Sequence, residues 1–307
     1  MIARLGPGLR WCISLAILAG LALWLEPARV IDQVRDIQLG WLALALLLGI
    51  IQMALSAWRW RFTAGRLGLK LEPGQALTDY YLAAFVNQIL PGGVLGDAWR
   101  AQRHAQRSGQ RGAAWRAVIL ERTSGQLIVL GLALLTLMFQ APWREHLLNI
   151  SDIVGIGLMG FGLLILLTGL ILRRSPVGRA QLAELAADAR RALLALNAWP
   201  LQLLSSVLIV LSYLLVFAAG ARGIGIDLAL GQLMLLALPV LLAMLIPVTV
   251  AGWGLREGAA GAIWLLAGLP PEQGVAASLA YGLLVLIASL PGAVVLAIGP
   301  RLQTDVH

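Results

Sequence analysis

The chain has 307 residues, of which 60% are hydrophobic and only 12% are charged, and its formal net charge is +8. Soluble domains are about 45–50% apolar and about 25% charged, so this composition excludes an ordinary soluble domain and predicts an integral membrane protein. The apolar runs are continuous rather than alternating, which favours membrane-spanning α-helices over barrel strands. The basic residues lie in short loops between these runs, which favours an anionic membrane surface over nucleic acid as their partner.

Uncharged runs of sufficient length are the candidates for full spans, which need about 20 residues each. They comprise residues 11–25, 41–57, 123–143, 153–172, 198–221 and 273–300. The first run follows Arg4 and Arg10 and so resembles a signal peptide. However, Glu26-Pro27 ends it without a small-residue cleavage site, and we therefore predict a retained first helix.

Two further apolar runs contain helix breakers. Residues 80–96 include Asn87 and a Pro-Gly-Gly turn, and residues 228–255 include Pro239, Pro247 and a glycine-rich stretch. Proline and clustered glycines end or kink helices, and a broken helix at membrane depth is tolerated only where protein or a wet cavity covers it. We predict that each run is a re-entrant hairpin, which enters the bilayer, breaks and leaves on the same side.

The distribution of arginine supports this topology. With the N-terminus inside, the basic segments 59–77, 97–116 and 173–197 all fall on the cytoplasmic side, as the positive-inside rule requires. If residues 80–96 crossed the bilayer, the densest arginine cluster would lie outside. Segment 176–196 combines Ala and Leu with charged residues, which predicts an amphipathic helix lying at the membrane surface.

The sequence therefore predicts an all-α polytopic helical membrane protein, with about six full spans and two re-entrant broken-helix hairpins. Residues 1–307 would form a single transmembrane domain, and residues 1–145 and 146–307 would form an inverted repeat of the kind found in many secondary transporters. We expect a multipass protein of the cytoplasmic (inner) membrane, with both termini in the cytoplasm.

The first candidate site is the stretch NQILPGGVLGDAWR, residues 87–100. Its amide side chain and helix breakers are Asn87, Pro91, Gly92, Gly93 and Gly96. Such a break can turn sharply and expose backbone amides to an anion such as phosphate. Asp97 and Arg100 are three residues apart, which places them on one face of a following helix. The alternative is an ordinary loop in which Asp97 is a helix N-cap.

The second candidate site is the stretch LIPVTVAGWGLRE, residues 245–257. Pro247, Gly252 and Gly254 break the run, and Arg256-Glu257 follow directly. Charged groups in such a run are costly and usually face a cavity or each other, so we expect this pair to be functional. The alternative is an extracellular loop with a solvated ion pair.

Further charges accompany these two motifs. Glu121 and Arg122 begin a predicted span, and because adjacent helical residues point about 100° apart they do not form one simple pair. Either one of them faces a cavity while the other snorkels toward the headgroups, or both anchor the span at the interface. Helical spacing also predicts one cationic stripe, which either recruits anionic headgroups or only sets topology. It comprises Arg100, Arg103, Arg107 and Arg111.

Several chemistries find no support in the sequence. Lys70 is the only lysine and lacks the glycine-rich context of a P-loop, so ATP hydrolysis through that motif is excluded. His104, His146 and His307 lie far apart outside the apolar runs, and Cys12 is the only cysteine. We find no catalytic triad, and we expect no metal, no cofactor and no enzymatic activity.

The two motifs, in this order and with Glu121-Arg122 between them, resemble the transmembrane region of lysylphosphatidylglycerol synthases, a flippase-like family of multipass proteins. The resemblance covers about residues 10–300. In fused members this region is linked to lipid translocation and a soluble domain makes the aminoacyl lipid. That synthase domain does not follow in this sequence, so the resemblance implies a stand-alone translocating part. Residues 249–251 (TVA) stand where the family is expected to have a glycine-containing stretch.

From the motifs and the resemblance together we expect a lipid flippase or transporter for a lipid with a phosphate-bearing or glycosylated headgroup. Arg100, Arg122 and Arg256 are the expected headgroup contacts, and Asp97, Glu121 and Glu257 their partners or proton carriers. Membrane lipids are the expected partners, with a lipid or glycan biosynthetic enzyme as a further candidate and no nucleic acid. The alternatives are a membrane-embedded lipid-modifying transferase and a non-transporting scaffold for such an enzyme.

Overall fold

The computed structural model describes residues 37–90, 93–139, 173–244 and 252–298, together with five isolated positions between residues 12 and 20. The predicted spans 11–25 and 153–172 therefore lie outside the continuous described ranges. Within these ranges the chain is helical and contains no strand. The prediction of an all-α polytopic membrane protein is confirmed. The helices are α3 (Leu39–Arg66), α4 (Pro73–Ile89), α5 (Leu95–Ser108), α6 (Arg111–Phe139), α8 (Pro176–Ala189), α9 (Trp199–Gly223), α10 (Leu230–Ala243), α11 (Leu255–Leu266), α12 (Pro271–Ser289) and α13 (Pro291–Ile298).

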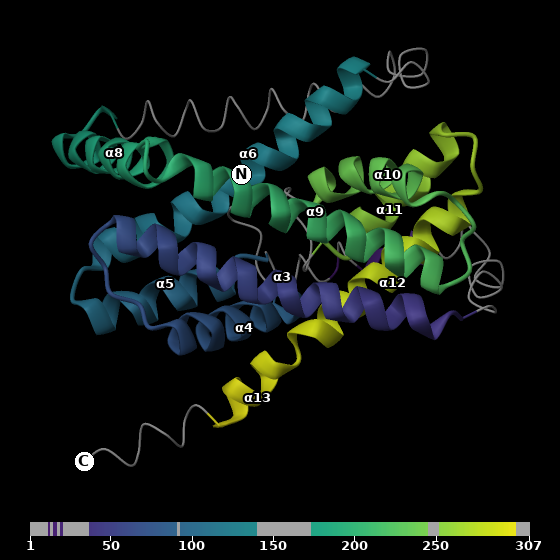
Figure 1. The fold of residues 1–307 in the computed structure, drawn as a ribbon, viewed down its shortest axis with the longest axis horizontal. Helices are drawn as coiled ribbons and strands as arrows, with labels where there is room; N and C mark the ends of the chain where they lie inside the picture. Colours follow the sequence, from purple (N-terminus) through teal and green to yellow (C-terminus); the bar gives the residue numbers. More distant parts are fainter. Residues whose placement is uncertain are drawn as a thin grey trace.

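Helices α3 and α9 form the long axis of the molecule (Figure 1). Together with α12 they are the helices of the described part that are long and apolar enough to cross a membrane. The backbone N–H of Gln38, just before α3, donates to the carbonyl of Gly223 at the end of α9 over 2.8 Å. At the other end, Arg66 donates to Asn197, just before α9, over 2.6 Å. The two spans therefore lie side by side and antiparallel.

Helices α4 and α5 form a helical hairpin beside α3. Arg107, near the end of α5, pairs with Asp79, near the start of α4, at 2.6 Å. At the opposite end of the pair, Asn87 of α4 donates to the Asp97 carboxylate of α5 over 3.1 Å. The two open ends therefore lie together at one end and the break lies at the other, which is the arrangement of a helical hairpin.

Helices α10 and α11 form the corresponding pair in the second half of the chain. Figure 1 places α4 and α5 toward one end of the long axis and α10 and α11 toward the other. The segment between α10 and α11, residues 245–251, lies outside the described residues. Each predicted hairpin region contains a pair of helices, whereas their re-entry into the membrane and the inverted repeat with its boundary at residue 145 stay predictions.

The described helices differ from the predicted runs at several ends. Helix α3 continues to Arg66, so Arg59 lies within the helix and not in a loop. The run 273–300 is divided into α12 and α13 at Pro291, because proline lacks the N–H that would continue the helix. Helix α6 begins at Arg111, twelve residues before the predicted span 123–143.

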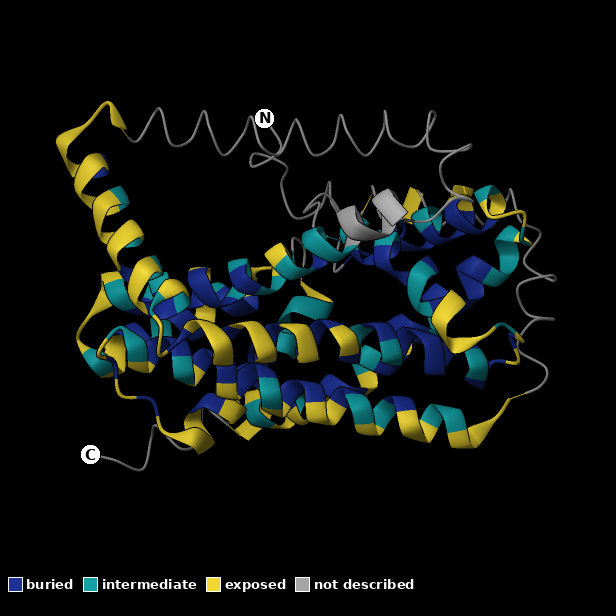
Figure 2. Ribbon diagram, turned by 45° about the horizontal axis from the view of Figure 1, so that its top comes forward, coloured by how far each residue is buried: buried dark blue, intermediate teal, exposed yellow. Residues whose placement is uncertain are grey.

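Two buried cores hold the hairpins in place. One packs α9, α10, α11 and α12 around Phe217 and Trp264, and the other packs α3, α4, α5 and α6 around Trp60. Figure 2 shows a large exposed surface on the helices around them, as expected where apolar side chains face lipid. Helix α8 and the short π-helix Arg190–Leu194 that follows it are mostly exposed. Their helical structure agrees with the predicted surface helix over 176–196.

Candidate functional site

Five charged side chains meet where the tip of the α4–α5 hairpin packs against α3 and α6. Glu121 of α6 accepts hydrogen bonds from Arg59 of α3 and Arg100 of α5, each at 2.6 Å on separate carboxylate oxygens. Arg100 also pairs with Asp97 at 2.8 Å, and Arg122 pairs with the same Asp97 at 2.8 Å. We call these five residues the arginine cluster. It joins α3 and α6 to the hairpin tip.

The arginine cluster holds three cations against two anions, so its net charge is +1. The side chains of Arg100 and Glu121 have no exposed surface, whereas 36% of the Arg122 side chain is exposed. Among the described residues, Nη1 of Arg100 and Nε of Arg122 are buried and have no hydrogen-bond partner. A buried charge without compensation is strongly unfavourable, and ionisable groups within a membrane usually mark a ligand or ion path.

Aromatic rings cover the guanidinium groups of the arginine cluster. The Arg100 guanidinium carbon lies 4.7 Å from the ring centre of Trp60 and 4.8 Å from that of Tyr80. Arg122 lies 6.0 Å from the same Tyr80 ring. Such cation–π contacts stabilise a desolvated cation without neutralising its charge. The positive charge of the cluster therefore remains available to an anion.

The predicted residues at the hairpin break shape its tip. The backbone N–H of Gly96 donates to the Asn87 side chain over 2.8 Å. A Cβ on Gly96 would overlap the carbonyl group of Ala83, so only glycine lets α5 approach α4 this closely. Gly93 has φ +61°, in the left-handed region that favours glycine. Pro91 and Gly92 lie outside the described residues.

The second motif forms a smaller buried pair at the start of α11. The Arg256 guanidinium donates to the Glu257 carboxylate over 2.6 Å, and neither side chain is exposed. Ser278 of α12 accepts from Arg256 over 3.0 Å and donates to Glu257 over 3.2 Å. The other Glu257 oxygen accepts from the backbone N–H of Gly254 over 2.7 Å. We call Arg256, Glu257 and Ser278 the α11 pair site.

Glycines also make room for the α11 pair site. Gly252 and Gly254 have φ values of +84° and +86°, which L-residues with a side chain adopt only with strain. The Arg256 guanidinium lies 4.8 Å from the Trp253 ring centre and would overlap a Cβ on Gly282. Its Nη1 has no hydrogen-bond partner within the described part of the chain. Pro247 lies outside the described residues.

No hydrogen bond or ion pair between described residues joins the two sites. Tyr213 of α9 interacts electrostatically with Arg122 of the arginine cluster and with Tyr281 of α12. Tyr281 in turn packs 5.4 Å from Arg256. Tyr281 therefore adjoins the α11 pair site, and Tyr213 interacts with both Tyr281 and the arginine cluster.

The chemistry of these sites is that of anion recognition. Guanidinium groups bind phosphate and carboxylate through parallel N–H donors, and the free N–H groups of Arg100, Arg122 and Arg256 are of this type. The amides of Gly96 and Gly254 already donate to side chains of the protein, so the N–H groups without a described partner are those of the arginines. Among the described residues no three His, Cys, Asp or Glu side chains form a group that could hold a metal ion.

The sequence reasoning missed Arg59, which it assigned to a cytoplasmic loop. Arg59 is only 3% exposed and binds Glu121 and Ser206. A signal was present, because the buried polar residues of α3 recur at helical spacing and so mark one face. They are Gln52, Ser56, Arg59 and Thr63.

The predicted cationic stripe is not one surface. Arg100 turns inward to Glu121, whereas Arg103 and Arg107 pair with the buried carboxylate of Asp79, at 3.2 and 2.6 Å. Helix α5 ends at Ser108, so Arg111 belongs to the next helix. The prediction of a single cationic stripe was wrong, because sequence spacing does not show where a helix ends. Its two middle arginines instead close the base of the hairpin.

The arginine cluster thus combines ion-paired arginines with buried N–H groups that lack a partner, which is the chemistry of a membrane protein that binds anions. Residues 11–292 match the family model described as the lysylphosphatidylglycerol synthase TM region. The chain therefore belongs to this family. Comparisons with curated proteins and with solved structures give no match. Membership of this family links the chain to lipid biosynthesis or flipping.

Proposed function

We propose that the chain is a lipid flippase, which moves a lipid with a phosphate-bearing or glycosylated headgroup across the cytoplasmic membrane and is not an enzyme. The observation that carries the proposal is the surplus of arginine in the arginine cluster, with buried N–H groups on Arg100 and Arg122 that lack a partner. A phosphate at this point would neutralise the surplus charge and satisfy these donors. The membership of the family supports a role with lipids.

Arg122 is the expected first contact of the headgroup. It is the most exposed arginine of the cluster, and it is held by Asp97 at 2.8 Å. An arriving phosphate would compete with Asp97 for Arg122 and would meet the free N–H of Arg100 behind it. Asp97 would remain bound to Asn87 and Arg100, so the loss of Arg122 to the phosphate would not leave the Asp97 carboxylate unpaired. The acyl chains would remain in the surrounding lipid.

The α11 pair site is the second contact of the proposed path. Arg256 has one N–H without a described partner, Tyr281 packs against its guanidinium, and Tyr213 interacts with both Tyr281 and Arg122. Tyrosine hydroxyls can bind phosphate or sugar oxygens, so they suit a headgroup that passes between two arginine sites. The path would run between hairpins that enter from opposite faces, which corresponds to the alternating-access design of transporters with inverted repeats. No nucleotide-binding motif is present, so a gradient, the membrane potential, a partner or equilibration would drive the movement.

Reconstitution tests the proposal. Purified protein in liposomes should accelerate the transbilayer movement of headgroup-labelled phospholipid, and Asp97→Asn and Glu257→Gln should slow it. Arg103→Gln is the matched control, because Arg103 lies on the same helix as Arg100 but pairs with Asp79 outside the cluster. Chemical change of the lipid would favour a lipid-modifying transferase. Absence of both movement and chemical change would favour a scaffold for a lipid or glycan biosynthetic enzyme.

A further inference from the structure

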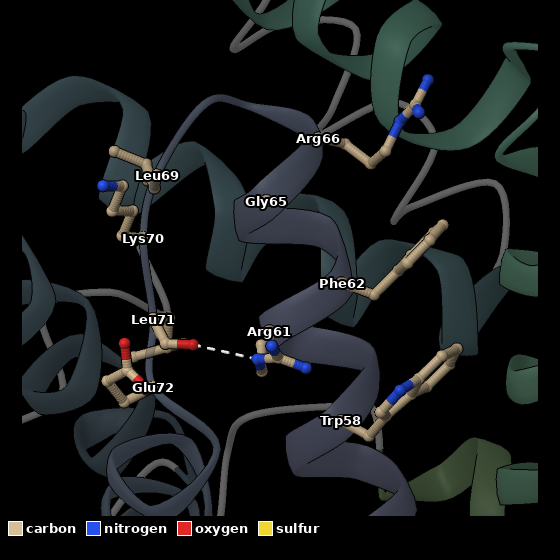
Figure 3. Close-up of a pocket in the computed structure, with 9 residues that line it drawn as sticks. All are labelled: Trp58, Arg61, Phe62, Gly65, Arg66, Leu69, Lys70, Leu71 and Glu72. Carbon is tan, nitrogen blue, oxygen red and sulfur yellow. Dashed lines mark hydrogen bonds between the residues drawn. The ribbon is translucent and has the colours of Figure 1, made fainter.

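A pocket of about 370 Å³ lies at the end of α3, outside the candidate functional site (Figure 3). Trp58, Arg61, Phe62 and Gly65 of α3 line it, and the connection to α4 supplies Lys70 and Glu72. On α3 these positions have the spacing of one helix face. Because successive residues are turned by about 100°, this face is distinct from the one that carries Arg59.

The pocket contains basic side chains with N–H groups that no described residue binds. Arg61 donates through Nε to the carbonyl of Leu71 over 3.0 Å, as Figure 3 shows, and its terminal N–H groups have no described partner. The Lys70 ammonium has none either among the described residues. Arg66, in contrast, donates to Asn197 over 2.6 Å and to the carbonyl of Arg191 over 3.3 Å, which ties it to the segment before α9. With Glu72 as the only acid among the lining residues, the pocket carries a net charge of +2, from three basic residues and one acidic residue.

Aromatic rings form the apolar side of the pocket. The rings of Trp58 and Phe62 stack with centres 5.5 Å apart and an angle of 15° between their planes. Trp58 is 38% exposed. The 28 residues of α3 correspond to about 42 Å, the thickness of a bilayer with its headgroups, so its last turns reach the headgroup level. Trp at this depth is typical of the membrane interface.

We propose that this pocket binds the phosphate headgroup of one anionic phospholipid from the leaflet around this end of α3. Arg61 and Lys70 bind the phosphate, and the Trp58–Phe62 pair packs against the glycerol and the first methylenes of the lipid. A basic pocket with an apolar side at headgroup depth matches both parts of such a molecule. This lipid is a resident partner, separate from any lipid that passes the arginine cluster, so the inference does not depend on the proposed function.

Gly65 offers a direct way to fill the pocket. A Cβ on Gly65 meets nothing within 4 Å, and its φ is not in the left-handed region. Gly65→Leu therefore places a side chain into the pocket without a backbone clash, and helix propensity favours the substitution. Gly40→Leu is the matched control, because Gly40 lies at the opposite end of the same helix and also has open space around it.

Native mass spectrometry of the full chain in mild detergent tests the proposal. Short-chain phosphatidylglycerol, phosphatidylcholine of the same chain length, and inorganic phosphate are each added to the wild type and to Arg122→Gln. We expect one phosphatidylglycerol to be retained in both proteins, while phosphatidylcholine binds about fivefold more weakly and phosphate does not compete. Gly65→Leu should lose the bound lipid and Gly40→Leu should keep it. Arg61→Gln and Lys70→Gln should each weaken binding about fivefold.

Four results would overturn the proposal. Retention of phosphatidylglycerol by Gly65→Leu at the wild-type level would place the lipid elsewhere. Equal binding of phosphatidylcholine would remove the role of the cations. Displacement of the lipid by inorganic phosphate would make this an anion site rather than a lipid site. Loss of the lipid in Arg122→Gln alone would assign it to the arginine cluster.

Discussion

Arg100 and Glu121 form a 2.6 Å ion pair in which neither side chain has any exposed surface. The second Glu121 oxygen binds Arg59 at the same distance, so one carboxylate joins α5 to both α3 and α6. A movement of the hairpin tip relative to the spans would have to break one of these bonds. The arginine cluster is therefore both the candidate binding site and the joint that sets the position of the hairpin.

Glu121→Gln should destabilise the protein strongly. It leaves the cluster with three cations and one anion, and breaking a buried ion pair from one side costs about 3–5 kcal/mol. Thermal unfolding in detergent should show a large decrease in Tm. Glu184→Gln is the control, because Glu184 also pairs with an arginine but its side chain is 60% exposed, and it should change Tm little. Equal effects of the two substitutions would show that burial of Glu121 contributes nothing.

Gly282→Ala should disturb the α11 pair site. The added methyl group would overlap the Arg256 guanidinium and approach Trp253 at 2.9 Å, so the buried pair must shift. We expect a lower Tm and slower lipid movement. Gly258→Ala on α11 has open space around its Cβ and should be neutral or stabilising by up to about 1 kcal/mol. A neutral Gly282→Ala would mean that Arg256 has more room than the packing shows.

Gly254→Ala should cost about 1–2 kcal/mol through backbone strain. Gly254 has φ +86°, and its N–H holds the Glu257 carboxylate. The measurement is the Tm in detergent, with Gly231→Ala on α10 as the control, because Gly231 has open space and no positive φ. If both variants unfold at the same temperature, the left-handed turn before α11 is not required.

Single-cysteine labelling should place the ends of each hairpin on one face of the membrane. In a Cys12→Ser background, Gln75→Cys and Gln110→Cys flank the α4–α5 hairpin at exposed positions and should react from the same side. Asp227→Cys and Ala267→Cys flank α10 and α11, are also exposed, and should both react from the opposite side. Labelling of the two ends of either hairpin from different faces would contradict the re-entrant arrangement and with it the inverted repeat.

Much of the site could be predicted from residue chemistry. The charges Asp97, Arg100, Glu121 and Arg122 stood out because charge within an apolar run is costly unless it is paired or used. The structure brings these four together, and Glu121 and Arg122 indeed point to different partners. The breaks were predictable for a similar reason, since proline and glycine end helices whatever the tertiary context.

The rest depended on contacts between distant parts of the chain. Nothing near Arg59 in the sequence shows that it meets a carboxylate 62 residues away, and its position at the end of an uncharged run favoured a loop. The same applies to Asp79, which closes the hairpin base with Arg103 and Arg107. The role of Gly282 is visible only where α12 passes Arg256. Sequence spacing shows which residues share one face of a helix, but it does not show which other helix packs against that face.

The most direct test of the account is the movement of a phosphate-bearing lipid by Arg122→Gln in liposomes, measured with the wild type and Arg103→Gln beside it. Arg122 is partly exposed and is not required to hold the spans together, so this variant should fold with a nearly unchanged Tm. The account predicts that the wild type and Arg103→Gln accelerate transbilayer movement of the lipid and that Arg122→Gln does so at least about tenfold more slowly. Movement by folded Arg122→Gln at the wild-type rate would contradict the claim that the arginine cluster carries the headgroup.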